Sequence, residues 1–213
     1  MSDGFHFRSI TFPPDGSVLS GLDLVIGSTE SVALFGPNGA GKSSLLRIVA
    51  GTAPGSHPLA EVAYLPQKPY MFRGTVQSNL VLGLSPDNSD IARRLAGELS
   101  VDHILGRSAN EISVGEAQRI GLARTLASSA PLVLLDEPIA PINTASRRTT
   151  VDVIRQRTEN RALLWATHSL DAVTGLADRL LVIDEGVIIR DGTVAEVVGN
   201  PGSGRVEEII GEG

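Results

Sequence analysis

The segment GPNGAGKS, residues 36–43, combines glycines, one lysine and one serine at a spacing suited to holding phosphate. Glycines let backbone N–H groups close around phosphate oxygens, and the start of a following helix adds partial positive charge. Lys42 could then reach the β- and γ-phosphates of a nucleotide, and Ser43 could offer its hydroxyl to Mg²⁺. The alternative interpretation is a glycine-rich turn with an accidental lysine. The predicted nucleotide-binding residues are Gly36, Pro37, Asn38, Gly39, Ala40, Gly41, Lys42, Ser43 and Ser44.

A second group with chemical potential is the acidic pair that ends PLVLLDEP, residues 131–138. The apolar run predicts a buried strand, and ligands of open α/β sheets collect at the carboxyl ends of such strands. Asp136 suits Mg²⁺, directly or through water, and Glu137 suits orienting or deprotonating an attacking water. Without the phosphate loop upstream, two solvated acids before a proline would be an equally good interpretation.

Apolar runs that alternate with helical patterns supply the frame for these residues. Runs that are apolar throughout predict a parallel sheet covered on both faces, and their order predicts an α/β class. Residues 5–26 alternate apolar and polar side chains and predict antiparallel strands beside that sheet. Helices are expected at 75–82, 89–99 and 113–127, with a short turn near 102–105. The predicted buried strands are SVALF (31–35), EVAYL (61–65), PLVLLDEP (131–138), RALLWATH (161–168) and DRLLVID (178–184).

The fold expected from this pattern is an α/β P-loop NTPase core with a mainly parallel sheet, N-terminal antiparallel strands and a helical insert. It would form a single domain over 1–213, with a core of about 1–68 and 128–213 and a helical subdomain of about 69–127. A hairpin at 184–186 and a short helix at 193–198 would follow, and the tail from 200 onward is expected to be loose.

Composition excludes several classes. Lys and Arg number 18 against 24 Asp and Glu, so the net charge of −6 disfavours a non-specific grip on nucleic acid. The chain has no cysteine, so neither a disulfide framework nor a cysteine-ligated metal is possible. No run approaches the roughly 18 apolar residues of a membrane span, and the start has no apolar signal core. A cytoplasmic location is therefore expected, with any membrane role exerted through a partner.

The segment ISVGEAQR, residues 112–119, begins with Ser113-x-x-Glu116, which is the pattern of a capping box. It predicts that a helix starts here. The N–H groups at such a start can also bind an anion, so a structural and a functional role are compatible.

The phosphate loop, Gln67, ISVGEAQR, LLDEP and ATHS occur in one order, and together they resemble the nucleotide-binding domain of ATP-binding cassette (ABC) proteins. The resemblance covers roughly residues 5–198. It implies a head-to-tail dimer with two ATP molecules between the subunits, each ATP meeting one subunit's phosphate loop and the other subunit's signature. The signature residues that would act in trans are Ser113, Val114, Gly115 and Glu116.

The same resemblance implies roles for further residues. Glu137 matches the catalytic carboxylate, and His168 matches the histidine that contacts the γ-phosphate and holds Glu137 and water in place. Gln67 matches the glutamine that senses Mg²⁺ and the membrane partner. The implied cofactors are ATP and Mg²⁺, with Ser43, Gln67 and Asp136 as metal ligands. An aromatic residue near the N-terminus stacks on adenine in this family; Phe12 is the first choice and Phe7 the second, although Phe12 could equally belong to the core.

Three departures from the family pattern stand out. Val114 replaces the signature's first glycine, and Glu116 replaces its glutamine. Asn143 stands where an aspartate usually ends the loop after LLDEP, so it keeps hydrogen bonding and loses charge. Asn143 is expected to affect communication between the two ATP sites of the implied dimer more than ATP binding itself. The interval between Lys42 and Gln67 is also short, as if a hairpin were missing.

Tyr70, Met71 and Phe72 form three large apolar side chains in a row after Gln67. Loops rarely bury such runs, so they suggest an apolar contact site. The resemblance implies a groove here for a transmembrane permease subunit, which would hold the chain on the cytoplasmic face of the membrane. The alternative is that these residues pack the helical insert onto the core.

Three functions remain open at this stage. The first is the ATP-hydrolysing subunit of an ABC transporter, working as a homodimer or as a heterodimer with another ABC ATPase. The second is a degenerate ATP-binding half of a heterodimer with little turnover. The third is a soluble ABC ATPase without a transport role, which the acidic charge and the lack of a coiled-coil insertion disfavour. The cargo and the direction of transport are not determined by this sequence.

Overall fold

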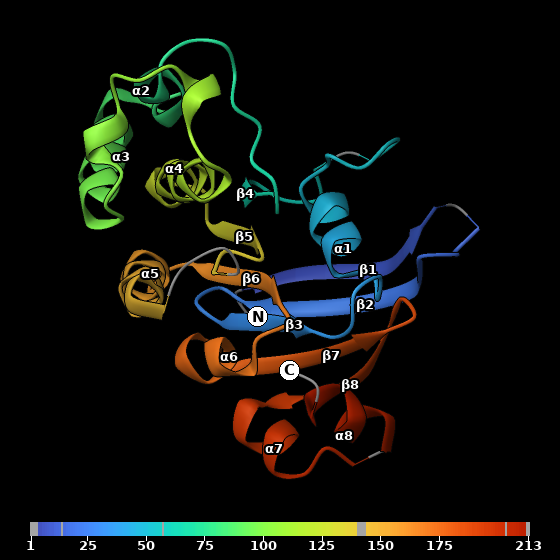
Figure 1. Cartoon of the computed structure of the whole chain (residues 1–213). Helices are drawn as coiled ribbons and strands as arrows, with labels where there is room; N and C mark the ends of the chain where they lie inside the picture. The colour runs from blue at the N-terminus through green and yellow to red at the C-terminus, as the bar shows by residue number, and fades with distance from the viewer. Residues whose placement is uncertain (1–3, 14, 57, 140–143, 203, 212–213) are drawn as a thin grey trace.

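The computed structural model describes residues 4–13, 15–56, 58–139, 144–202 and 204–211, and the side chains of 144–146 are outside the description. A six-stranded sheet has the order β4-β5-β6-β3-β7-β8 (Figure 1). Five strands are parallel, and β8 is antiparallel to β7. The strands are β3 (Ser31–Phe35), β4 (Val62–Leu65), β5 (Leu132–Asp136), β6 (Ala162–Thr167), β7 (Arg179–Asp184) and β8 (Val187–Thr193). The predicted parallel sheet is therefore confirmed.

Two apolar cores lie on opposite faces of this sheet, because successive strand residues point to opposite sides. In β3, Ala33 and Phe35 join one core, whereas Val32 and Leu34 join the other. Helix α1 (Lys42–Val49) covers the second face together with the N-terminal strands. Helices that cover the first face include α5 (Thr144–Thr158), α6 (Leu170–Leu176) and α7 (Val194–Gly199).

The N-terminal strands β1 (Gly4–Phe12) and β2 (Leu19–Gly27) pair antiparallel in a separate two-stranded sheet, as predicted. Between α1 and β4 the described residues contain no strand. This agrees with the expectation that the short interval lacks a hairpin.

The segment between β4 and β5 is helical, and Figure 1 shows its helices α2, α3 and α4 grouped at one end of the molecule. Thr75 caps α2 and Ser85 caps α3, each accepting a hydrogen bond from a backbone N–H three residues on. The sequence placed these helices correctly to within a few residues. The elements are α2 (Val76–Leu80), α3 (Pro86–Glu98), η1 (Asp102–Ile104), η2 (Ala109–Glu111) and α4 (Val114–Ala127).

The prediction that the C-terminal tail is loose is wrong. It forms α8 (Gly204–Gly211), in which Val206 and Ile209 are buried. Residues three apart lie on one helix face, so these two side chains dock the helix on the core. Arg205 adds an ion pair to Asp184 at 2.7 Å. In the part of the chain that the structure describes, no helix has both the length and the apolar character needed to cross a bilayer.

Candidate functional site

The loop 36–41 joins the end of β3 to the start of α1, and close packing requires glycine at two of its positions. A Cβ on Gly36 would lie 2.1 Å from the carbonyl oxygen of Ile183 in β7. Gly41 has φ of 104°, and a Cβ there would lie 2.9 Å from Leu19 Cδ2. Side chains at these positions would therefore force the loop away from β7 and β2, and its backbone could not wrap closely around a ligand.

Lys42, the first residue of α1, turns its side chain back into this loop. Its Nζ donates to the carbonyl oxygens of Gly36 at 2.6 Å and Pro37 at 2.9 Å. Burial lowers the pKa of the ammonium group, and the carboxylates of Glu137 and Asp136 act in the opposite direction. A cation held in this way at a buried position is well placed to meet an anionic ligand.

Ser43 and Asp136 connect α1 to the carboxyl end of β5. The Ser43 hydroxyl donates to Asp136 Oδ1 at 3.0 Å, so the phosphate loop and the acidic strand end form one site. Burial raises the pKa of Asp136, while the hydrogen bond from Ser43 and the backbone N–H of Gln67 lower it. Two residues that are distant from Asp136 in the sequence therefore approach its carboxylate.

Glu137 follows directly after β5 and has a φ of 50°, in the left-handed region that non-glycine residues rarely adopt. Its backbone N–H donates to the carbonyl oxygen of Ala166 at 3.0 Å, which anchors it to β6. His168, just after β6, brings Nδ1 to 3.0 Å from Glu137 Oε1. Unusual backbone geometry of this kind concentrates at functional sites, and here it turns a buried carboxylate toward the loop.

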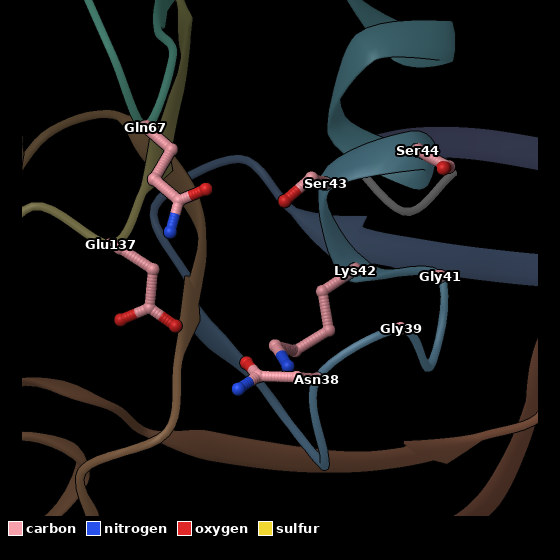
Figure 2. Close-up of a pocket in the computed structure, with 8 residues that line it drawn as sticks. All are labelled: Asn38, Gly39, Gly41, Lys42, Ser43, Ser44, Gln67 and Glu137. Atoms are coloured by element: carbon pink, nitrogen blue, oxygen red, sulfur yellow. The ribbon is translucent and has the colours of Figure 1, made fainter.

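These elements enclose a pocket of about 430 Å³, within the range of small-ligand sites. Figure 2 shows Gln67 and Glu137 on one side of it, facing Ser43, Lys42 and Asn38 on the other. The lining residues are Asn38, Gly39, Gly41, Lys42, Ser43, Ser44, Gln67 and Glu137. The sequence analysis named all eight as site residues, and the fold brings together positions from 38 to 137.

The donor set beside this pocket fits Mg²⁺. It consists of the Ser43 hydroxyl, the Asp136 carboxylate and the Gln67 side-chain amide, all of which can offer oxygen. The described residues contain no cluster of three or more His, Cys, Asp or Glu that could hold a metal by themselves. A sparse set is what Mg²⁺ uses when phosphate and water complete its shell.

The signature segment lies at the start of α4 and does not line this pocket. Ser113 and Glu116 form the predicted capping box: Ser113 Oγ accepts from Glu116 N–H at 3.3 Å, and Ser113 N–H donates to Glu116 Oε2 at 2.7 Å. The Ser113 hydroxyl also donates to Oε2 at 2.7 Å. Val114 is 71% exposed, so the end of the helix is open to a second molecule.

The two candidates for adenine stacking differ in position. Phe7 is buried in the core, which removes it from contact with a ligand. Phe12 is half-buried and pairs with Leu19, the residue that packs on Gly41, so it lies near the phosphate loop without lining the pocket. Asn143 falls outside the described residues.

Two buried amides were missed by the sequence analysis. Asn79 holds the loop before α2 by accepting from Phe72 N–H at 2.7 Å and donating to Phe72 O at 2.9 Å. Gln118 is buried in α4. An amide on the apolar face of a predicted helix was the available signal for both, because such residues are normally exposed.

Comparisons with known proteins agree with this geometry. The family described as "ABC transporter" matches residues 19–140. The thiamine import ATP-binding protein ThiQ of Yersinia pestis is 35% identical over 89% of this chain and 90% of its own length. The aliphatic sulfonates import ATP-binding protein SsuB 2 of Rhizobium johnstonii is 35% identical over 82% of this chain and 74% of its own.

A solved structure described as the ATP binding subunit of an ABC transporter has the same fold, with a TM-score of 0.81 over 97% of this chain and 98% of that one, at 20% identity. The sequence matches extend from the N-terminal strands through the phosphate loop, the signature and the acidic strand end. The chain therefore belongs to the ABC transporter family, as an ATP-binding domain of such a transporter.

Proposed function

We propose that this chain hydrolyses ATP in the pocket at the phosphate loop and that hydrolysis drives import through a separate permease subunit. The observation that carries the proposal is the position of Glu137. Its carboxylate lines the same pocket as Lys42 and Ser43, and His168 lies 3.0 Å from it. A binding module without turnover would not need a carboxylate held in this strained position beside the phosphate loop.

In this proposal each residue of the site has a distinct role in phosphoryl transfer. Lys42 and the loop amides hold the phosphates, and Phe12, which lies near the loop, would stack on the base. Ser43, Asp136 and Gln67 would hold Mg²⁺, which when bound neutralises charge that develops on the phosphate oxygens. Glu137 orients the attacking water or accepts its proton, and His168 fixes the Glu137 carboxylate. Catalysis then depends mainly on positioning and electrostatics.

We further propose that two ATPase subunits act together, as a homodimer or a heterodimer. Support comes from the place of Ser113, Val114, Gly115 and Glu116, which lie outside the pocket of their own chain, at an exposed helix N-terminus. A helix start attracts anions, so this end of α4 suits the γ-phosphate of ATP bound to a partner subunit.

Residues 69–127 would act as a helical subdomain on a core of 1–68 and 128–213.

We propose that the permease subunit docks at the loop after Gln67. Tyr70 is 70% exposed and Phe72 is 51% exposed, and their rings meet edge to face with centroids 4.8 Å apart. Met71, in contrast, packs partly against the core. Two exposed aromatic rings held on a loop by buried Asn79 favour a docking site for an apolar helix. Such docking would hold the chain at the cytoplasmic face of the membrane.

The names of ThiQ and SsuB 2 both specify import, and this chain covers most of the length of each protein. Both are named as import ATP-binding proteins. Their named cargoes, thiamine and aliphatic sulfonates, differ, so the proposal extends to import and not to one cargo.

The test measures the mass of Glu137→Gln by light scattering with and without Mg-ATP, beside wild-type ATPase rates. An ATP-dependent dimer together with wild-type turnover supports a self-sufficient motor. A monomer in ATP with negligible wild-type turnover contradicts it and indicates that a different ATPase subunit supplies part of the site. Lys42→Ala is the control, because it removes the phosphate-binding cation and should give neither a dimer nor turnover.

A further inference from the structure

Gln118 lies in the second turn of α4, where it is 1% exposed, and among the described residues neither its Nε2 nor its Oε1 has a hydrogen-bond partner. An amide side chain can donate two hydrogen bonds and accept two. Burial without any of them is a free-energy cost that an apolar residue of the same size would avoid. Buried orphan amides of this kind are rare enough to need an explanation.

The neighbour of Gln118 is identified through Gly121, one turn further along α4. A Cβ on Gly121 would lie 2.9 Å from both Leu65 Cδ1 and Pro69 Cγ, so the chain crosses the helix closely at this point. Residues three apart share a helix face. Gln118 is therefore on the face of α4 that the segment 65–69 covers, on the side nearer to Ser113.

That segment also reaches the nucleotide pocket. The side chain of Gln67 lines it, and the backbone N–H of Gln67 lies close enough to the Asp136 carboxylate to lower its pKa. One short stretch of chain thus touches the pocket on one side and α4 on the other. Residues 65–69 therefore connect the pocket to the face of α4 that carries Gln118.

We propose that Gln118 is a positioning residue, whose amide bonds the main chain of residues 66–68 in a second conformation that bound nucleotide favours. This proposal rests on the nucleotide site proposed above. A ligand shifts a conformational equilibrium only by interacting differently with the two states, and an amide that gains hydrogen bonds in one state supplies such a difference. Because Gln118 is on the helix that presents Ser113, the same bond orients the signature when the pocket is filled.

The test is Gln118→Met, which keeps the volume and removes the polar atoms. Without nucleotide, we expect a melting temperature equal to or above that of the wild type, because no hydrogen bond is lost. We expect the dissociation constant of a non-hydrolysable ATP analogue with Mg²⁺ to rise about tenfold, the effect of one lost hydrogen bond. Gln118→Leu should behave in the same way. Leu122→Met, a volume-conserving change on the same helix, should leave the dissociation constant unchanged.

Hydrogen exchange gives a readout that a purely structural role would not move. The analogue should protect the backbone N–H groups of Gln67, Lys68 and residues 70–72 in the wild type and in Leu122→Met, and this protection should be lost in Gln118→Met. If Gln118→Met instead lowers the melting temperature without nucleotide and binds the analogue normally, the amide is already satisfied and the proposal is overturned. If the analogue fails to bind the wild type, the proposed nucleotide site itself is wrong and the proposal fails with it.

Discussion

The imidazole Nδ1 of His168 lies 3.0 Å from Oε1 of Glu137, although one side chain is 61% exposed and the other only 7%. The exposed ring thus covers a buried carboxylate at the edge of the pocket. Both residues stand at the carboxyl ends of neighbouring parallel strands, β6 and β5, which explains how 31 positions of sequence separation become direct contact. The geometry assigns His168 an action through Glu137, because the ring does not line the pocket itself.

If His168 and Glu137 act as one unit, the losses of ATPase rate caused by substituting each of them should not multiply in the double variant. His168→Ala should lower kcat by roughly 10²-fold and leave ATP affinity nearly unchanged, because the imidazole contacts Glu137 and is not among the residues that line the pocket. The double variant with Glu137→Gln should be no slower than Glu137→Gln alone. Steady-state ATPase assays of the four proteins decide this, and multiplied losses in the double variant would show that the two residues act separately.

The capping serine of α4 has a matched control elsewhere in the chain. Ser113 with Glu116 and Thr193 with Glu196 form two capping boxes of the same design. Ser113→Ala and Thr193→Ala should each lower the free energy of unfolding by about 1 kcal/mol, because each leaves backbone donors without a partner. Only Ser113→Ala should also weaken the ATP-dependent dimer. Equal dimerisation in the two variants would remove Ser113 from the proposed interface.

The charge of Glu116 gives a prediction about pH. Hydrogen bonds from Ser113 lower the pKa of the Glu116 carboxyl below its ordinary value of 4.5, so the ionised form favours the folded state. This stabilisation is fully present above pH 4.5 and is lost as pH falls through the folded-state pKa. Glu116→Gln should therefore be slightly less stable than the wild type at pH 7, with the difference vanishing in more acidic solution, as measured by urea unfolding across pH.

At neutral pH the same substitution should strengthen the ATP-dependent dimer. The carboxylate of Glu116 adds negative charge at the helix end that would meet a γ-phosphate, and Gln removes it. Glu196→Gln is the control, since hydrogen bonds from Thr193 lower its pKa in the same way and it lies on another helix. A similar effect of both variants on the dimer would show that the charge acts through overall electrostatics.

Substitutions of Phe72 and of Asn79 should have different effects: the first on docking to the permease, the second on the stability of the fold. Phe72→Ala should change the free energy of unfolding by under about 0.5 kcal/mol and leave ATP binding intact, because the ring is largely exposed. It should weaken co-purification with the permease subunit. Unchanged co-purification and transport would refute the docking site.

Asn79→Ala, unlike Phe72→Ala, should clearly lower the free energy of unfolding of the isolated subunit. Loss of its amide leaves the N–H and carbonyl groups of Phe72 and the carbonyl of Thr75 with fewer partners, at a cost of about 1–3 kcal/mol. Chemical denaturation of the two variants beside the wild type measures the contrast. If Asn79→Ala is as stable as the wild type, the amide does not hold this loop.

The sequence by itself determined the local elements and the chemistry they carry. The loop GPNGAGKS, the acidic end of β5 and the capping box at Ser113 are continuous in the chain, so residue type and spacing were enough to predict them. The order of apolar runs was likewise enough for the parallel sheet. The tail was predicted incorrectly because α8 is short and owes its helix to docking by Val206 and Ile209, a contact that no local pattern reveals.

Only the tertiary structure decided which of these residues meet. The bond from Ser43 to Asp136 spans 93 positions and exists because α1, which follows β3, also packs against β5, two places along the sheet from β3. The same packing buries Phe7, anchors the Phe72 loop on Asn79 and leaves the Gln118 amide without a hydrogen-bond partner in the described part of the chain. Such relationships depend on which faces are covered, and burial turns an ordinary amide or carboxyl group into one whose hydrogen bonds and charge control the site.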